Sequence, residues 1–258
     1  MRFDIKRGKL FDSLAMDYDR FRPGYPRAII NEVVALSSLK SSSRLFEIGC
    51  GTGKATVHFA SHGYLIDCVD PGKKLLGLAK ENCRNWPQVS FQLGKFEEAS
   101  VEADSYDLVY SAQAFHWVDP AVRMIKVARA LKAGGSLALL QNYPGKEVDS
   151  TIETLAAAIQ MESRGAMEPW DYFEDLSNLM DEIEDCGFFE APTLVRHRWT
   201  QKYSAESYAG LFRTYSDFLS LPKRTQGRIS GRIMEIVKGN GGEVTRSYDS
   251  IMLHARRK

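Results

Sequence analysis

The segment Arg44 to Lys54, Arg-Leu-Phe-Glu-Ile-Gly-Cys-Gly-Thr-Gly-Lys, constrains the fold of this chain more than any other. In it an apolar run stops at Glu47, and glycines then occupy positions 49, 51 and 53. Glycine tolerates positive φ and lets the backbone approach a bound molecule closely. The residues after Lys54 suit a helix whose free N–H groups face that molecule. The pattern predicts a strand, a tight turn around a ligand, and a helix.

Two details of this turn limit which classes of ligand it can bind. A nicotinamide dinucleotide fingerprint would have its third glycine one residue later, at Lys54, so the spacing disfavours that cofactor. Glu47 ends a strand that we expect to be buried on both faces, where an unpaired carboxylate is costly. A cationic partner is expected there, and the ammonium group of a bound amino acid would serve. The alternative is a glycine-rich turn with a solvated Glu47.

Four segments carry a family resemblance. Glu-Ile-Gly-Cys-Gly-Thr-Gly at 47–53 resembles the first motif of class I S-adenosylmethionine (SAM) dependent methyltransferases. Ser-Ala-Gln-Ala-Phe-His-Trp-Val-Asp at 111–119 is very similar to a Gln-Ala-x-His-Trp segment of type 11 methyltransferases, and Tyr-Asp-Arg-Phe-Arg-Pro-Gly-Tyr-Pro at 18–26 resembles an amino-terminal segment of the same group. Gly-Lys-Phe-Glu at 94–97 resembles a Gly-x-Ala-Glu segment of the family, with Phe96 in place of the usual small residue. The similarity is nearly continuous over 11–141 and weaker over 200–255. It implies SAM as cofactor and S-adenosylhomocysteine (SAH) as product.

Bulk properties favour small binding partners over polyanions. With 258 residues, a net charge of +1 and a pI near 7.7, the chain has no strong long-range attraction to nucleic acid or to anionic membranes. It has no apolar run of membrane-spanning length, and Met1–Leu10 is too charged for a secretory signal, so we expect a cytoplasmic protein. The four cysteines lack metal-ligand spacing, which predicts reduced thiols and no metal site.

Strand and helix patterns alternate after the glycine turn. Strands are predicted at 64–69, 88–93, 106–111 and 136–141. Helices are predicted at 73–83 and from Asp119-Pro120, a favourable helix start, to Ala133-Gly134-Gly135. Such alternation implies right-handed crossovers and a parallel sheet covered on both faces. The predicted fold class is therefore α/β, with a doubly wound, mostly parallel, seven-stranded Rossmann-like sheet.

The second half of the chain has a different period. Helices are predicted at 149–160, 171–185, 205–215 and 222–238, and strands at 193–200 and 243–255. We expect residues 1–142 to form an amino-terminal lid segment and the SAM-binding core. Residues 143–258 are expected to add helical cap insertions, which form a lid, and the last two strands, all within the same domain.

The resemblance implies a set of cofactor-binding residues. Asp70, one residue past the second strand, would accept hydrogen bonds from the ribose, although it could instead cap the next helix. Phe96 would lie against the adenine or be ordinary core. Glu97 would contact the adenine, or it could be a surface carboxylate or a loop cap. The full set is Tyr18, Arg22, Glu47, Gly49, Cys50, Gly51, Gly53, Asp70, Phe96, Glu97, Ala112 and Gln113.

The reaction predicted from these features is methyl transfer to a small-molecule acceptor. His116 is the candidate general base, and the alternative is a histidine packed into an aromatic corner. Arg22 could bind a carboxylate of the cofactor or the acceptor, and together with Arg213 it favours a carboxylic acid acceptor. Aromatic side chains from Trp170 to Phe218 could line the acceptor pocket. The competing hypotheses are a nonenzymatic SAM-binding regulator and a nicotinamide-dependent oxidoreductase.

Overall fold

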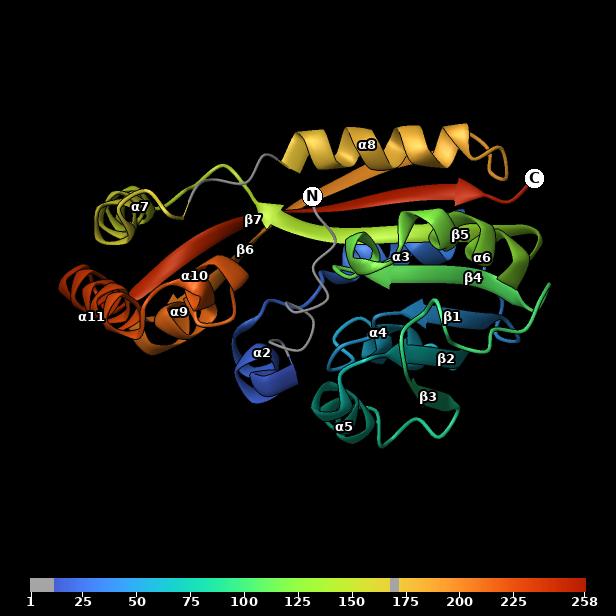
Figure 1. The fold of residues 1–258 in the computed structure, drawn as a ribbon, viewed down its shortest axis with the longest axis horizontal. Coiled ribbons are helices and arrows are strands. Elements are labelled where there is room, and N and C mark those ends of the chain that lie inside the picture. The colour runs from blue at the N-terminus through green and yellow to red at the C-terminus, as the bar shows by residue number, and fades with distance from the viewer. Residues whose placement is uncertain (1–11, 168–171) are drawn as a thin grey trace.

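A computed structural model of the protein describes residues 12–167 and 172–258 (Figure 1). Within them, one seven-stranded sheet has the strand order β3-β2-β1-β4-β5-β7-β6. The first five strands are parallel, and β7 pairs antiparallel with both β5 and β6. The α/β class and the mostly parallel sheet are therefore confirmed. The strands are β1 Arg44–Ile48, β2 Leu65–Asp70, β3 Val89–Leu93, β4 Tyr106–Ala112, β5 Leu131–Pro144, β6 Thr193–Ser204 and β7 Glu243–Arg256.

Helices cover both faces of this sheet. The α-helices are α2 Ala15–Phe21, α3 Arg27–Leu36, α4 Thr56–Ala60, α5 Lys73–Asn82, α6 Pro120–Ala130, α7 Ser150–Ser163, α8 Tyr172–Asp185, α9 Ala205–Phe212, α10 Ser216–Ser220 and α11 Lys223–Gly239, and Phe115–Trp117 forms a short 3-10 helix. Buried side chains of α6 and α8 share one hydrophobic core with the sheet, and those of α3, α4 and α5 share another.

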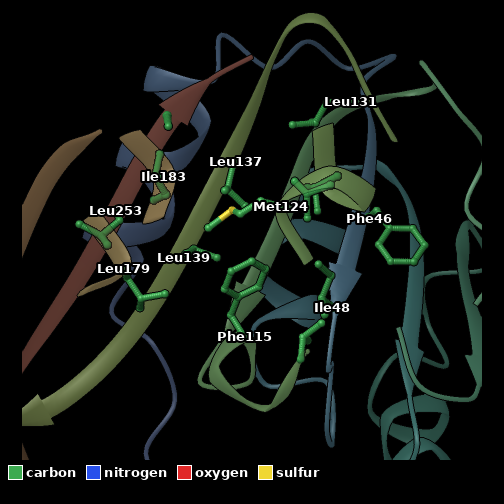
Figure 2. Close-up of a cluster of buried hydrophobic side chains, with 14 of the residues drawn as sticks. Phe46, Ile48, Phe115, Met124, Leu131, Leu137, Leu139, Leu179, Ile183 and Leu253 are labelled. Carbon is green, nitrogen blue, oxygen red and sulfur yellow. The ribbon is translucent and has the colours of Figure 1, made fainter. Parts of the chain in front are cut away.

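Alternate residues of strand β5 contribute to the hydrophobic cores on the two faces of the sheet. Leu137 and Leu139 belong to the core under α6 and α8, whereas Ala138 and Leu140 belong to the opposite core. This division follows from the two-residue period of a strand. Figure 2 shows Leu179 and Ile183 of α8 directed toward the β5 and β7 side of the first core. A strand that is apolar at every position thus indicates burial on both faces.

The junction between α6 and β5 differs from the prediction. The helix was expected to end at Gly134-Gly135, but it ends at Ala130, and Leu131 already has extended backbone angles (φ −71°, ψ 144°). Leu131 is fully buried and pairs with Tyr106, so its burial favours an early entry into the sheet. Gly134 does adopt positive φ (+72°), but it lies where the pairing with β4 shifts register. The glycine pair therefore shapes an irregular strand start.

The last three strands are longer than the others and carry a second layer of helices. Strands β5 and β7 have 14 residues each, and β6 has 12. Figure 1 shows their ends projecting past β1 to β4, with α7, α9, α10 and α11 gathered around the projection. These helices share a third hydrophobic core with the projecting ends of β6 and β7. This arrangement places helices above the carboxyl edge of the parallel strands. Within the two described segments, no helix is both long and apolar enough to span a membrane.

Candidate functional site

A cavity of about 1680 Å³ opens at the carboxyl ends of the parallel strands. Its walls come from the glycine turn, α2, the loop after β4, α7, α10 and the projecting part of β7. Pockets for one drug-sized ligand usually measure roughly 300–1,000 Å³. The cavity therefore has room for two small molecules side by side. Its position is the one expected for ligands of doubly wound sheets.

The three glycines of the turn have positive φ for different reasons. At Gly49 (φ +70°) an added Cβ would lie 2.3 Å from the Ala114 Cβ, so this glycine allows the loop after β4 to pack on the turn. Gly51 (φ +56°) lines the cavity, and an added Cβ would enter open space. Gly53 (φ +83°) lies behind the turn, where its missing side chain leaves room for Ala79 of α5. Only Gly49 and Gly51 of the three line the cavity.

Glu47 is buried at the end of β1 and also lines the cavity. Its Oε2 accepts hydrogen bonds from the Thr56 hydroxyl at 2.5 Å and the Tyr110 hydroxyl at 2.8 Å, and the Cys68 thiol lies 3.9 Å away. Burial raises the pKa of Glu47 to about 7, although the hydroxyl donors oppose the shift. Neutral hydroxyl donors therefore hold Oε2, where the sequence predicted a cation. In the described part of the chain, no hydrogen bond uses Oε1.

Asp70 holds the turn together at the end of β2. Its Oδ2 accepts the Gly51 N–H at 2.9 Å, and its Oδ1 accepts the Gly72 N–H at 2.7 Å, just before α5. Asp70 therefore binds backbone amides before the next helix, which is the structural alternative to ribose binding. Asp70 also lines the cavity. Asp12, which the sequence analysis did not single out, caps α5: its Oδ1 accepts the Lys74 N–H at 2.6 Å. The sequence carries no signal for this contact, because Asp12 and Lys74 are 62 residues apart.

The segment after β3 makes structural contacts. Phe96 is 3% exposed and packs in the first core, with its ring centroid 5.9 Å from that of Phe46. Glu97 accepts the Asp119 N–H at 2.9 Å and so supports the start of α6. Both residues nevertheless line the cavity. The core and loop-cap alternatives for these two residues are present in the fold, and their contact with adenine stays a prediction.

The loop after β4 borders the middle of the cavity. Ala112, Gln113 and His116 all line it, and Gln113 has a positive φ of 62°. Residues other than glycine rarely adopt this conformation, and it is often found at functional sites. The Gln113 side chain donates to the Asn142 carbonyl at 2.8 Å, which fixes the loop to β5. Burial and the charge of Arg123 lower the pKa of His116 to about 4.

Helix α2 is fastened to the glycine turn. The Lys54 ammonium donates to the Asp19 carbonyl at 2.6 Å. The Asn82 side chain donates to the Asp19 carboxylate at 3.1 Å and to the Thr52 carbonyl at 2.9 Å. Lys54, the residue that departs from the nicotinamide fingerprint, thus joins the amino-terminal segment to the turn. Tyr18 and Arg22 of this segment line the cavity.

The structure changes the predicted arginine pair. Arg213 does not line the cavity; its Nε lies 3.3 Å from the Asp17 carboxylate, and its guanidinium lies over the Phe21 ring. Arg246 of β7 lines the cavity instead and donates to the Tyr215 hydroxyl at 3.3 Å. Sequence reasoning missed Arg246 because a single arginine in an alternating strand resembles an ordinary solvated position. Of the aromatic candidates, Trp170 lies outside the described residues.

The cysteines carry free thiols, and two of them meet beneath the turn. A hydrogen bond with the Cys68 thiol and burial raise the pKa of Cys50 well above the usual range. Cys50 also lines the cavity. No group of three or more histidine, cysteine or acidic side chains in the described residues is arranged to hold a metal ion.

Comparison with known proteins identifies the family. The family model described as a methyltransferase domain, of type 11, matches residues 46–139, which include the glycine turn and the loop after β4. Residues 46–139 of this chain therefore belong to the methyltransferase-domain family of type 11. This match confirms the resemblance of the motifs at 47–53 and 111–119, whereas the segment at 18–26 lies outside the matched region. The matched region supplies much of the cavity wall.

The similarity to named methyltransferases extends beyond the matched region for some relatives. An uncharacterized methyltransferase of Mycobacterium tuberculosis is 36% identical over 132 residues, which are 51% of each chain. One from Schizosaccharomyces pombe is 28% identical over 234 residues, 90% of this chain and 88% of its own. The chain thus spans about half the length of the first curated relatives it matches.

A solved structure supports the fold. Phosphoethanolamine N-methyltransferase 2 of Haemonchus contortus, in complex with phosphomonomethylethanolamine and SAH, has a TM-score of 0.58 and 14% identity. The similarity covers 98% of this chain and 59% of that one. At this identity the likeness concerns the fold, which includes the projecting carboxy-terminal region.

Proposed function

We propose that this protein transfers the methyl group of SAM to a small carboxylic acid. The observation that carries the proposal is one cavity that is lined by the glycine turn and Asp70 and also by Arg22 and Arg246. The motif residues of the family thus share one space with two arginines and neighbouring aromatic side chains. Such a space suits a cofactor and an acceptor bound next to each other.

The residues at the turn fit the cofactor. Glu47 Oε1 would receive the ammonium group, and Asp70 would receive the ribose hydroxyls beside the amides it already binds. Ala112 and Gln113 would border the sulfonium. Gly49, Cys50 and Gly51 would form the backbone floor, while Gly53 acts through packing. Phe96 and Glu97 would border the adenine, and Tyr18 would cover the amino-acid arm.

The chemistry requires little of the protein beyond positioning. When bound, SAM supplies a methyl group on cationic sulfur: a bond forms between an acceptor oxygen and the methyl carbon, the carbon–sulfur bond breaks, and its electron pair stays on sulfur. Holding two reactants in line can contribute roughly 7–11 kcal/mol. A cavity shared by the donor and the acceptor would supply this alignment.

A carboxylate acceptor agrees with the state of His116. With a pKa of about 4, this imidazole is neutral at pH 7 but is a weak base toward an alcohol or an ammonium ion. A carboxylate already has a free lone pair and needs no base. His116 then acts as an uncharged wall of the cavity beside Trp117, whose ring centroid lies 4.9 Å away.

Two measurements test this function against its rivals. In a thermal-shift assay SAM should raise the melting temperature and NAD should not, because only a ligand of the folded state stabilises it. Stabilisation by NAD alone would instead support an oxidoreductase. Incubation with SAM and a panel of small carboxylic acids should form SAH together with a methyl ester. SAM binding with no turnover on any member of a broad metabolite panel would support a nonenzymatic regulator.

A further inference from the structure

Two arginines from distant parts of the chain converge on Tyr215. The Arg22 Cζ lies 4.4 Å from the centroid of the Tyr215 ring and 5.5 Å from that of Tyr18. Arg246 donates from Nη1 to the Tyr215 hydroxyl at 3.3 Å. Arg22, Arg246 and Tyr215 all line the cavity. The tyrosine thus stands between two guanidinium groups, one over its ring and one at its hydroxyl.

Both guanidinium groups keep a buried N–H without a partner. In the described part of the chain, the Nε atoms of Arg22 and Arg246 are buried and have no hydrogen-bond acceptor. The Nη2 of Arg22 donates to the Thr214 carbonyl at 2.8 Å, which fixes the side chain without neutralising it. A buried donor with no acceptor costs about 1–3 kcal/mol, and more when it is charged. The arrangement is therefore incomplete without an acceptor.

The described residues supply carboxylates as well as guanidinium groups to this region. Glu147 is the carboxylate that interacts with Arg246; burial raises the pKa of Glu147, while the hydrogen bond from the Ser247 N–H and the charge of Arg246 oppose this shift. Asp217 also lines the cavity, and its carboxylate accepts from the Ser216 hydroxyl at 3.4 Å. Arg22 contacts a carbonyl and two tyrosine rings in the described residues.

Given the proposed function, we infer that Arg22 and Arg246 form a subsite that binds the oxyanion of the methyl acceptor. The planar guanidinium fork matches a carboxylate better than an ammonium group would. Phe212 and Tyr248 line the same part of the cavity, so the subsite accepts a small acid that carries an apolar body. Arg246 is thus a specificity-determining residue. A phosphate monoester offers the same oxyanion chemistry, and the experiment separates the two.

The test measures ligand binding to the SAH-saturated protein. The probes are phenylacetate and hexanoate, their amides phenylacetamide and hexanamide, and phenyl phosphate, each titrated calorimetrically. At least one carboxylate should bind ten times or more tightly than its amide, and more tightly than phenyl phosphate. Arg246→Gln should reduce the affinity for that carboxylate about tenfold or more and leave the affinity for SAH within twofold. Arg246→Lys, which keeps the charge, should recover part of the loss.

Arg213→Gln is the matched control, because Arg213 lies near the same helices but outside the cavity. It should leave the preference for acid over amide unchanged. If the SAH complex binds no carboxylate more tightly than its amide, the inference is wrong and the proposed cofactor is not affected. A preference for phenyl phosphate would overturn the carboxylate assignment, and a loss in Arg213→Gln equal to that in Arg246→Gln would overturn the role of Arg246. Failure of the wild-type protein to bind SAH would instead overturn the proposed function.

Discussion

The two glycines that line the cavity, Gly49 and Gly51, differ in what an added methyl group would meet. Alanine at either position carries a penalty of about 1–2 kcal/mol for positive φ. Gly49→Ala also places a Cβ 2.3 Å from Ala114, and such overpacking adds about 1–3 kcal/mol. We expect Gly49→Ala to lower the free energy of unfolding more than Gly51→Ala. Chemical denaturation of the two variants measures this difference, and equal losses would contradict the packing role of Gly49.

Glu47 makes the stability of the fold depend on pH. Its pKa rises from 4.5 in the unfolded chain to about 7 in the folded one, so the folded state binds the proton more tightly. The stabilisation from this proton is present below pH 4.5 and is lost as the pH rises through 7, by on the order of 3 kcal/mol. Glu47→Gln should remove this dependence. The free energy of unfolding of the variant, relative to that of wild type, should therefore be greater at pH 8 than at pH 5.

Urea denaturation at pH 5 and pH 8 measures the effect of Glu47→Gln. The exposed Glu235, which pairs with Arg232 on the surface, provides the control Glu235→Gln, whose difference from wild type should not change with pH. If the free energies of unfolding of wild type and Glu47→Gln changed in parallel with pH, burial would not raise the pKa of Glu47 in the folded protein.

Single residues were predictable from sequence where one local rule decides their position. Asp70 could be placed because the ends of parallel strands meet at one edge, and the turn glycines because positive φ is costly for other residues. For Glu47 the sequence predicted a cationic partner. The hydrogen bond from Tyr110 could not be foreseen, because Tyr110 lies in another strand. Arg246 was missed for a similar reason: its position depends on how β7 pairs with β6, far from the motif in sequence.

At the scale of elements, α2 depends on contacts with the turn and with α5. Asn82→Ala removes the hydrogen bonds to the Asp19 carboxylate and the Thr52 carbonyl. We expect a loss of about 1–3 kcal/mol in stability and faster amide hydrogen exchange in α2, because its tether to α5 is gone. Hydrogen exchange read by mass spectrometry measures this change, and unaltered protection of α2 would show that other contacts hold it. Asn240→Ala, which removes a side-chain bond within the end of α11, is the control and should leave α2 unchanged.

Element order was easier to predict than element ends. The local period of the hydrophobic residues predicts the alternation of strands and helices. Every predicted strand of the sheet is present. The end of α6 was misplaced because the burial of Leu131 outweighs the stop signal of Gly134. Burial of this kind is a property of the assembled sheet and has no local marker.

At the scale of the whole molecule, we propose that residues 12–142 and 143–258 fold as one domain. Strand β5 pairs with β7 from Ser136–Arg256 to Pro144–Tyr248, so the two parts share one continuous sheet. Thermal unfolding should therefore show one transition, with equal calorimetric and van't Hoff enthalpies. Two resolved transitions would show that the carboxy-terminal region is a separate unit.

The central claim is that the glycine turn, Arg22 and Arg246 line one cavity for a methyl donor and its acceptor. Isothermal titration of the wild-type protein with SAH tests the donor half of this claim most directly. We predict binding of one molecule per chain, weakened at least tenfold by Gly51→Ala, whose methyl group enters the space beside the turn. No binding of SAH to the folded wild-type protein, or equal binding by the Gly51→Ala variant, would contradict it.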